Sequence, residues 1–349
     1  MNKARPRPFQ VNSPGFAVPG YQADDFLPAD PALLAAAAQD RQGTARRGLL
    51  RRLLRSSQAL SGLILLTLLL LLAFILPLLI PYPYDQQIRG ANNLPPLGQT
   101  AQEAELLAAG GRACPHFLGC DGLGRDYLVR LLYGARISLL VGLAASLAVL
   151  VIGALLGAIA GWLGGRVDAL LMRLADLLSI VPDILVVVLL QVVLEAPLRQ
   201  LLGRGAVPAA LGSGLASMFI TFALLYWVGM ARLVRGQVLR LKQQDFVLAA
   251  QALGSNSSRI IRRHLLPNCA GEIIALACLQ LPGAIFLESV LSFLGLGVAP
   301  PLASLGSLAA DALGGIYTYP YRLLATALLL TLIVLAFNLL GDGVGDMLG

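Results

Sequence analysis

Six long apolar runs constrain the fold of this 349-residue chain more than any other feature. The first run, residues 59–80, contains no charged side chain. A helix of about 20 apolar residues crosses the hydrocarbon core of a bilayer, and only helices or closed barrels satisfy their backbone hydrogen bonds there. The sequence therefore predicts an all-α integral membrane protein with six transmembrane helices. The five further runs are residues 137–163, 177–194, 205–231, 273–299 and 323–340.

The composition agrees with a chain that lies in lipid. Hydrophobic residues make up 57% of the sequence and charged residues 13%, whereas soluble domains carry about 25% charged residues. The net charge of +7 comes from basic residues that flank the apolar runs, without the aromatic and basic stripe of a nucleic-acid-binding surface. We therefore expect membrane lipid around the chain and no nucleic-acid partner.

The distribution of lysine and arginine predicts the orientation in the membrane. Residues 1–58 hold nine of the 26 basic residues, and we expect them to form a cytoplasmic N-terminal tail. The segments on that side then collect 18 basic residues, and the outer segments collect eight. Because basic residues concentrate on the cytoplasmic side, both termini are predicted to be cytoplasmic. Residues 81–135 then form an external, periplasmic loop, and residues 136–349 form a five-helix core.

A long basic connection, residues 232–271, separates the fourth and fifth predicted spans. In its first half, Phe246, Ala250 and Leu253 fall on one face of a helix that Gly254 would end. An exposed amphipathic helix at this place suits insertion into a groove on a partner protein. The same periodicity suits a surface helix that lies at the lipid headgroups, so the pattern alone leaves both interpretations open.

The second half of this connection predicts another short helix. Ser255, Asn256 and Ser257 offer N-caps for a helix over residues 259–266. Pro267 would end that helix before the fifth span begins. The expected arrangement is a short helix, a sharp turn and a second short helix.

Two features inside the apolar runs need a structural explanation. Glu288 sits in the middle of a run, where an isolated charge costs about 3 kcal/mol. It either pairs with other side chains inside the bundle or lines a translocation path. Gly153, Gly157, Gly161 and Gly165 are spaced by four residues, which places them on one helix face. They either allow close helix packing or line a pore.

The sequence lacks the residues that catalysis would need. A phosphate-binding loop has a lysine directly after a glycine, and neither of the two lysines, Lys3 and Lys242, follows one. His116 falls in the predicted external loop and His264 in the predicted cytoplasmic connection, so neither offers a base inside the bilayer. No histidine or cysteine set has metal-ligand spacing. We expect no enzymatic activity, metal site or cofactor in this chain, and any ATP hydrolysis would need another subunit.

Cys114 and Cys120 lie close together in the predicted external loop. In an oxidising compartment they would close a small disulfide loop, which contributes about 2 kcal/mol. Two unrelated thiols are the alternative.

One motif in the connection between the fourth and fifth spans resembles that of a known family. The pattern Leu248-Ala-Ala-x3-Gly254, followed by His264-x-Leu266-Pro267, is similar to the EAA loop of ABC importer permeases, E-A-A-x3-G-x9-I-x-L-P. Leu248 stands in place of the glutamate and His264 in place of the isoleucine. In that family a short coupling helix in this loop docks into the ATP-binding subunit. The resemblance assigns this docking role to Phe246, Leu248, Ala249, Ala250, Leu253, Gly254, Leu266 and Pro267.

The resemblance covers residues 50–349 in order. Residues 118–126 and 133–138 resemble the LGTDxxGRD and YGARxS block of dipeptide and oligopeptide permeases. Residues 286–295 look most like the C-type permease of the oligopeptide branch. Further blocks that resemble this family are residues 161–168, 231–237, 292–297 and 338–343.

The resemblance implies a fold, a function and a set of partners. The fold would be that of a type I ABC importer permease with a cytoplasmic coupling helix, in a bacterial inner membrane. The function would be that of the transmembrane permease subunit of an ATP-driven oligopeptide or dipeptide importer. Its partners would be a second homologous permease, two ATPases that carry ATP and Mg²⁺, and an external solute-binding protein. Nickel chelates, glutathione or antimicrobial peptides are alternative cargoes in this family, and a membrane channel or an exporter half is the alternative outside it.

Overall fold

The computed structural model describes residues 56–110, 114–202, 213–298 and 302–348. Only the last three residues of the predicted tail, residues 1–58, fall within these ranges. The described residues form helices and connecting loops, with isolated antiparallel bridges between Gly98 and His116 and between Cys120 and Asp126.

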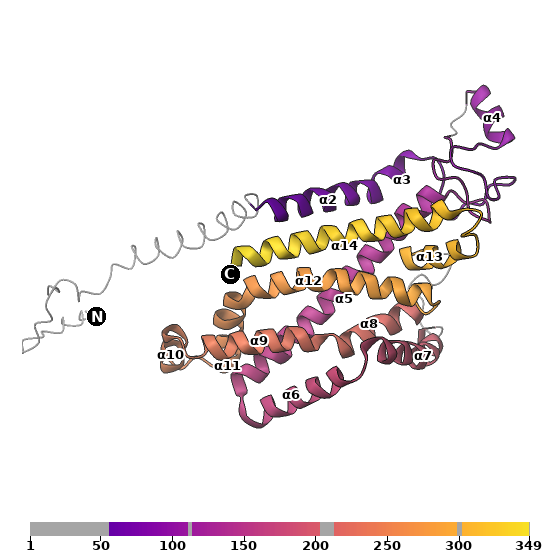
Figure 1. The fold of residues 1–349 in the computed structure, drawn as a ribbon. Helices are drawn as coiled ribbons and strands as arrows, with labels where there is room; N and C mark the ends of the chain where they lie inside the picture. Colours follow the sequence, from indigo (N-terminus) through magenta and orange to yellow (C-terminus); the bar gives the residue numbers. More distant parts are fainter. Residues whose placement is uncertain (1–55, 111–113, 203–212, 299–301, 349) are drawn as a thin grey trace, which may run out of the picture. The chain divides into compact units, whose positions relative to one another are not determined.

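Six helical segments in the described part of the chain are long and apolar enough to cross a membrane, as the six runs predict (Figure 1). The spans comprise α2 (Ser57–Phe74) with α3 (Leu76–Leu79), α5 (Tyr127–Leu163), α7 (Asp183–Leu202), α8 (Ser213–Leu225) with α9 (Trp227–Leu241), α11 (Ser257–Ile260) leading into α12 (Leu266–Phe293), and α14 (Pro320–Leu348). Between the spans lie α4 (Ala101–Ala108), α6 (Gly165–Ile180), α10 (Asp245–Ala252) and α13 (Leu305–Leu313).

The second span begins earlier than predicted, inside the stretch assigned to the external loop of residues 81–135. Asp126 caps α5, because its carboxylate accepts a hydrogen bond from the Val129 amide at 2.8 Å. Arg136 interrupts the apolar run in the sequence, but in the structure its guanidinium donates a hydrogen bond to the Ala73 carbonyl at the end of α2. The charge therefore has a partner, and the helix runs through it.

The predicted third span, residues 177–194, is divided in the structure. α6 ends at Ile180, and α7 begins at Asp183 after Pro182. A proline disfavours helical backbone in the residue before it, and Val181 is extended, with φ −87° and ψ 139°. The apolar run therefore continues across a break between two helices.

Ion pairs hold α6 antiparallel against α9. Arg232 donates to the Asp176 carboxylate at 2.7 Å, and Arg235 donates to both oxygens of Asp168. Ala175 of α6 is fully buried against the first turns of α9. These partners explain why α9 continues past the arginines that were expected to end the fourth span.

The connection between the fourth and fifth spans is therefore shorter than the predicted residues 232–271. α9 reaches Leu241, and the helix that leads into the fifth span begins at Ser257, with α10 between them. The second short helix, predicted over residues 259–266, does not end at Pro267 but continues through a π-helical turn, residues 261–265, into α12. The wider turn precedes Pro267, which occupies the first turn of α12, where a missing amide hydrogen costs nothing.

Three of the four spaced glycines bring α5 into close contact with α9. A Cβ on Gly153 would lie 2.5 Å from Met230 Cβ, and one on Gly157 would overlap the Ala231 backbone. A Cβ on Gly161 would lie 2.9 Å from Val238 Cβ, further along α9. Gly165 begins α6 at φ +55° and is not part of this contact. The structure favours the packing interpretation of the glycine stripe, because each of the three lies against a neighbouring helix.

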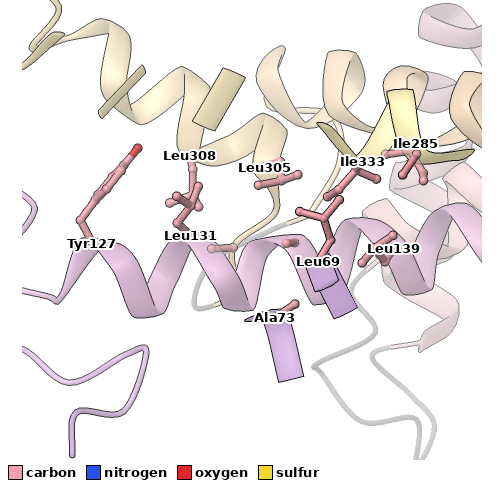
Figure 2. Close-up of a cluster of buried hydrophobic side chains, with 12 residues drawn as sticks. Leu69, Ala73, Tyr127, Leu131, Leu139, Ile285, Leu305, Leu308 and Ile333 are labelled. Atoms are coloured by element: carbon pink, nitrogen blue, oxygen red, sulfur yellow. The ribbon is translucent and has the colours of Figure 1, made fainter. Parts of the chain in front are cut away.

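One cluster of buried side chains joins the first and last spans to the centre of the bundle. Figure 2 shows Leu69 of α2 and Leu139 of α5 beside Ile333 of α14. At one end of the cluster, the Tyr127 hydroxyl donates to the Arg322 carbonyl at 3.0 Å. This cluster fixes α2, α5, α12, α13 and α14 as one packed unit.

Candidate functional site

The helix α10 lies in the connection that resembles the EAA loop, and a glycine turn ends it. The Ser255 amide bonds the Ala250 carbonyl at 3.0 Å, the pattern of a Schellman C-cap. Gly254 has φ +77°, and a Cβ placed on it would meet no atom within 4 Å. The turn therefore requires the backbone freedom of glycine and leaves open space around it.

The exposed face of α10 differs from the predicted one. Leu253 is 86% exposed and Leu248 51% exposed, and Phe246 also faces outward. Ala250, which was predicted to share a face with Phe246 and Leu253, is instead buried beside Val247. The eight-residue periodicity identified an amphipathic helix but assigned Ala250 to the wrong face.

The buried face of α10 belongs to a hydrophobic cluster that also contains residues of α5, α9 and α12. Val247 and Ala250 share a cluster with Val238 of α9 and Ala158 of α5. The Lys242 ammonium, at the end of α9, donates to the Trp162 carbonyl at the end of α5 at 2.7 Å. The hydrophobic cluster therefore links α10 to the same end of the bundle at which α5 and α9 are bonded to each other.

The remaining predicted docking residues lie on two different helices. Ala249 is exposed on α10, whereas Leu266 and Pro267 belong to the first turn of α12. Leu266 is half-buried against the same cluster as Val247, and Pro267 is exposed. The structure thus brings the exposed residues of α10 together and places Leu266 and Pro267 at the base of the next span.

Glu288 lies inside the bundle with a full set of hydrogen-bond donors. It is 0% exposed, and its two carboxyl oxygens accept bonds of 2.7 Å from the Ser138 and Ser292 hydroxyls. Each serine oxygen in turn accepts a backbone amide, from Leu305 at 3.1 Å and from Val298 at 3.2 Å. Glu288 therefore connects α5, α12 and the start of α13, and these contacts favour the structural interpretation over a path-lining one.

A cavity of about 540 Å³ opens beside this network, on the other face of α12. Its walls are the α6–α7 break at Asp183, the α8–α9 break at Tyr226, and the middle of α5 and α12. Glu288 is not among its lining residues, although Leu287 is.

Cys114 and Cys120 are not bonded to each other in the structure. The Cys114 backbone is fixed by the Tyr82 hydroxyl, which donates to its carbonyl at 3.0 Å and accepts from its amide at 3.1 Å. Cys120 is fully buried, and its carbonyl accepts a 2.6 Å hydrogen bond from Arg322. This arrangement corresponds to the alternative of two unrelated thiols.

Sequence reasoning missed a buried charged cluster in the segment between α3 and α5. His116 is 0% exposed, with Nδ1 at 2.6 Å from Asp126 and Nε2 at 3.1 Å from Glu103. Burial alone would lower the pKa of His116, but hydrogen bonds to Asp126 and Cys120 raise it to about 10. The protonated ring therefore donates to both carboxylates and ties α4 to the start of α5. Separations of ten and thirteen residues have no periodicity that would reveal these pairs.

Comparison with known proteins identifies the family. Residues 153–349 match the model described as the inner membrane component of binding-protein-dependent transport systems, and residues 45–96 match the N-terminal transmembrane domain of oligopeptide transport permease C. The chain belongs to this family of transport permeases. The predicted fold, an all-α type I ABC importer permease with six transmembrane helices, is confirmed, and the chain is a multi-pass membrane protein.

The chain is also similar to individual permeases over most of its length. It is 39% identical over 290 residues to the oligopeptide permease OppC of Bacillus subtilis (strain 168), which covers 83% of this chain and 84% of that protein. It is 41% identical over 299 residues to the dipeptide permease DppC of the same strain, covering 85% and 83%. It is 36% identical over 298 residues to OppC of Escherichia coli (strain K12), covering 85% and 88%.

Proposed function

We propose that this chain is one of two permease subunits of an ATP-driven importer of short peptides in a bacterial inner membrane. The similarity to oligopeptide and dipeptide permeases supports the cargo class. The observation that carries the mechanism is α10, a short helix with exposed apolar residues on one face and two buried residues that belong to the same hydrophobic cluster as residues of α5 and α9. The second permease is a homologous subunit, and an external solute-binding protein delivers the peptide.

The orientation follows from the charge distribution. With both termini in the cytoplasm, α10 faces the cytoplasm and the segment between α3 and α5 lies outside. This placement puts most basic residues on the cytoplasmic side, as the positive-inside rule requires. It also presents Leu253 and Leu248 to the compartment that contains ATP.

The free energy for transport comes from partner subunits. This chain has no lysine after a glycine and so no phosphate-binding loop. Two ATPases would bind ATP and Mg²⁺ and receive the exposed face of α10 in a groove. Their closure would displace α10, and the hydrophobic cluster that it shares with α5 and α9 would transmit the motion to the spans. The two permeases would thereby alternate between outward-open and inward-open states.

Co-purification tests this proposal. The tagged chain would be isolated in mild detergent from native membranes, and its partners identified by mass spectrometry. We expect a second six-span permease and two ATPases with phosphate-binding loops. A peptide bound to the attached binding protein would support the assignment of peptides as the cargo. A bound nickel chelate or glutathione would instead identify that ligand as the cargo. Repeated recovery of the chain alone would contradict the proposed complex.

A further inference from the structure

The cavity beside α12 lies where the helices on its walls are interrupted. Pro182 and Asp183 mark the break between α6 and α7, and Tyr226 marks the break between α8 and α9. Pro282 lies inside α12 at the same level as the lining residues Gln280 and Gly283. In secondary transporters, cargo sites near the bilayer midplane are formed by interrupted helices, and the walls of this cavity share that feature.

The charge of the cavity favours a cation. Asp183 is the one carboxylate among the described lining residues, and no lysine or arginine is among them. α6 ends at Ile180 and α8 ends at Leu225, beside this carboxylate and beside Tyr226. A helix C-terminus carries a partial negative charge, but α7 begins at Asp183 and α9 at Trp227, so the partial positive charge of their N-termini offsets it. The charge of the cavity therefore rests on the Asp183 carboxylate.

Unpartnered polar atoms also point to a ligand. Ser146 is only 5% exposed, and its hydroxyl has no hydrogen-bond partner. The Gln280 side-chain oxygen in the same wall also lacks one. Buried polar groups are normally hydrogen-bonded, and those that are not require an explanation. A ligand that donates hydrogen bonds would satisfy both groups.

The remaining walls are apolar. Val149, Phe222 and Leu287 line the cavity, while Asp183 and Phe286 are exposed, so the site is open to the surface of this subunit. The volume of about 540 Å³ falls within the usual range for small-ligand sites. A ligand with a cationic donor group and apolar substituents matches these features.

We propose that this cavity binds the amino-terminal end of a peptide during transport, with Asp183 accepting hydrogen bonds from the terminal ammonium and with Ser146 and Gln280 completing the polar contacts. The proposal rests on the proposed function, because it takes the cargo to be a peptide. It assigns to this subunit a specific contact with the cargo, in addition to its role in coupling. A lysine side chain of the cargo would supply the same ammonium chemistry, so the test has to separate the two sources.

Protection from alkylation tests the site in the purified complex. Phe286→Cys introduces a thiol at an exposed position of the wall, and its reaction with a maleimide is followed by mass spectrometry of the fragment that contains position 286. Trialanine at about ten times its Kd should slow the reaction about tenfold, because the unoccupied fraction falls as one plus the ratio of peptide concentration to Kd rises. N-acetyltrialanine should have no effect, and N-acetyl-Lys-Ala-Ala should also have none, because its ammonium is on the side chain.

A second substitution links the protection to Asp183. With Asp183→Asn added, trialanine should no longer slow the reaction, whereas Asp183→Glu should retain part of the protection. Glu195→Gln is the matched control, because Glu195 lies on the same helix and pairs with Arg199 outside the cavity. That variant should behave like the parent.

Three outcomes would each overturn the assignment of this site. They are equal protection by trialanine and its acetylated form, unchanged protection in Asp183→Asn, and no protection by trialanine at all. Protection by N-acetyl-Lys-Ala-Ala would overturn the preference for the terminal ammonium. Uptake of trialanine by the wild-type complex is measured in parallel. This measurement distinguishes a failure of the proposed site from a failure of the proposed function. Uptake without protection would leave the importer intact and remove only the site.

Discussion

At the scale of single residues, the structure depends on a few positions where no other side chain fits. Gly157 is such a position, because its missing side chain allows α5 to touch the Ala231 backbone of α9. Gly236, on α9, is a helical glycine of the opposite kind, since a Cβ there would meet nothing within 4 Å. The two glycines provide a matched pair for testing the helix contact.

Gly157→Ala should destabilise the protein, and Gly236→Ala should not. The added methyl group at position 157 forces α5 and α9 apart, and overpacking of this kind costs about 1–3 kcal/mol. We expect a thermal midpoint lower by about 5 °C in detergent. Gly236→Ala should leave the midpoint unchanged or raise it, because alanine favours the helix. Fluorescence-detected size-exclusion chromatography after heating measures both, and equal midpoints would contradict the close contact.

His116 should make stability depend on pH in the alkaline range. Burial lowers its pKa, but hydrogen bonds to Asp126 and Cys120 outweigh this effect and raise the pKa from about 6.5 to about 10. A raised pKa in the folded state adds stability that is complete below about pH 6.5 and lost as pH rises to about 10. The thermal midpoint of the wild type should therefore fall between pH 7 and pH 10. In His116→Gln this fall should largely disappear, and identical pH profiles for the two proteins would exclude the buried ion pair.

At the scale of secondary-structure elements, α10 and its glycine turn form the part that we assign to coupling. Gly254→Trp should leave membrane insertion intact but abolish transport and weaken association with the ATPases. The indole would fill the open space at the turn, and φ +77° is strained for any side chain. Gly254→Ala isolates the strain and should have the smaller effect. Co-purified ATPase and peptide uptake are the measurements, and normal transport by Gly254→Trp would refute the coupling role.

The number of spanning helices followed from hydropathy, but their ends did not. Arg136 and Arg232 stopped the predicted spans because a linear sequence does not show the Ala73 carbonyl or the Asp176 carboxylate that bonds them. Pro267 appeared to end a helix because a π turn cannot be read from composition. Each error arose where a tertiary contact or a local distortion removed the free-energy cost of a charge or a proline within a helix.

The sequence predicted the position of the candidate site along the chain but not which of its side chains are buried. The motif located α10 and Gly254, whose turn has the conformation that a glycine stop predicts. The apolar pattern of so short a helix could not distinguish the buried face from the exposed face, and Ala250 was misplaced. The cavity at Asp183 depends on breaks in helices that are far apart in sequence, so no single stretch of the chain could reveal it.

At the scale of the whole molecule, the account predicts opposite sides of the membrane for two exposed positions. Tyr317, before α14, is fully exposed, and Ser258, before α12, is also exposed. In intact spheroplasts, a membrane-impermeant maleimide should label Tyr317→Cys. Ser258→Cys should be labelled only after the membrane is permeabilised. The wild type gives the background from the native cysteines, and the reverse pattern would invert the proposed orientation.

The central claim is that this chain forms half of an ATP-driven peptide pathway. Its most direct test is uptake of labelled trialanine into proteoliposomes that contain the co-purified complex, with the binding protein added outside. The account predicts accumulation that requires both ATP and the binding protein and that is lost in the Gly254→Trp complex. Accumulation without ATP, or none by a complete complex that hydrolyses ATP, would contradict it.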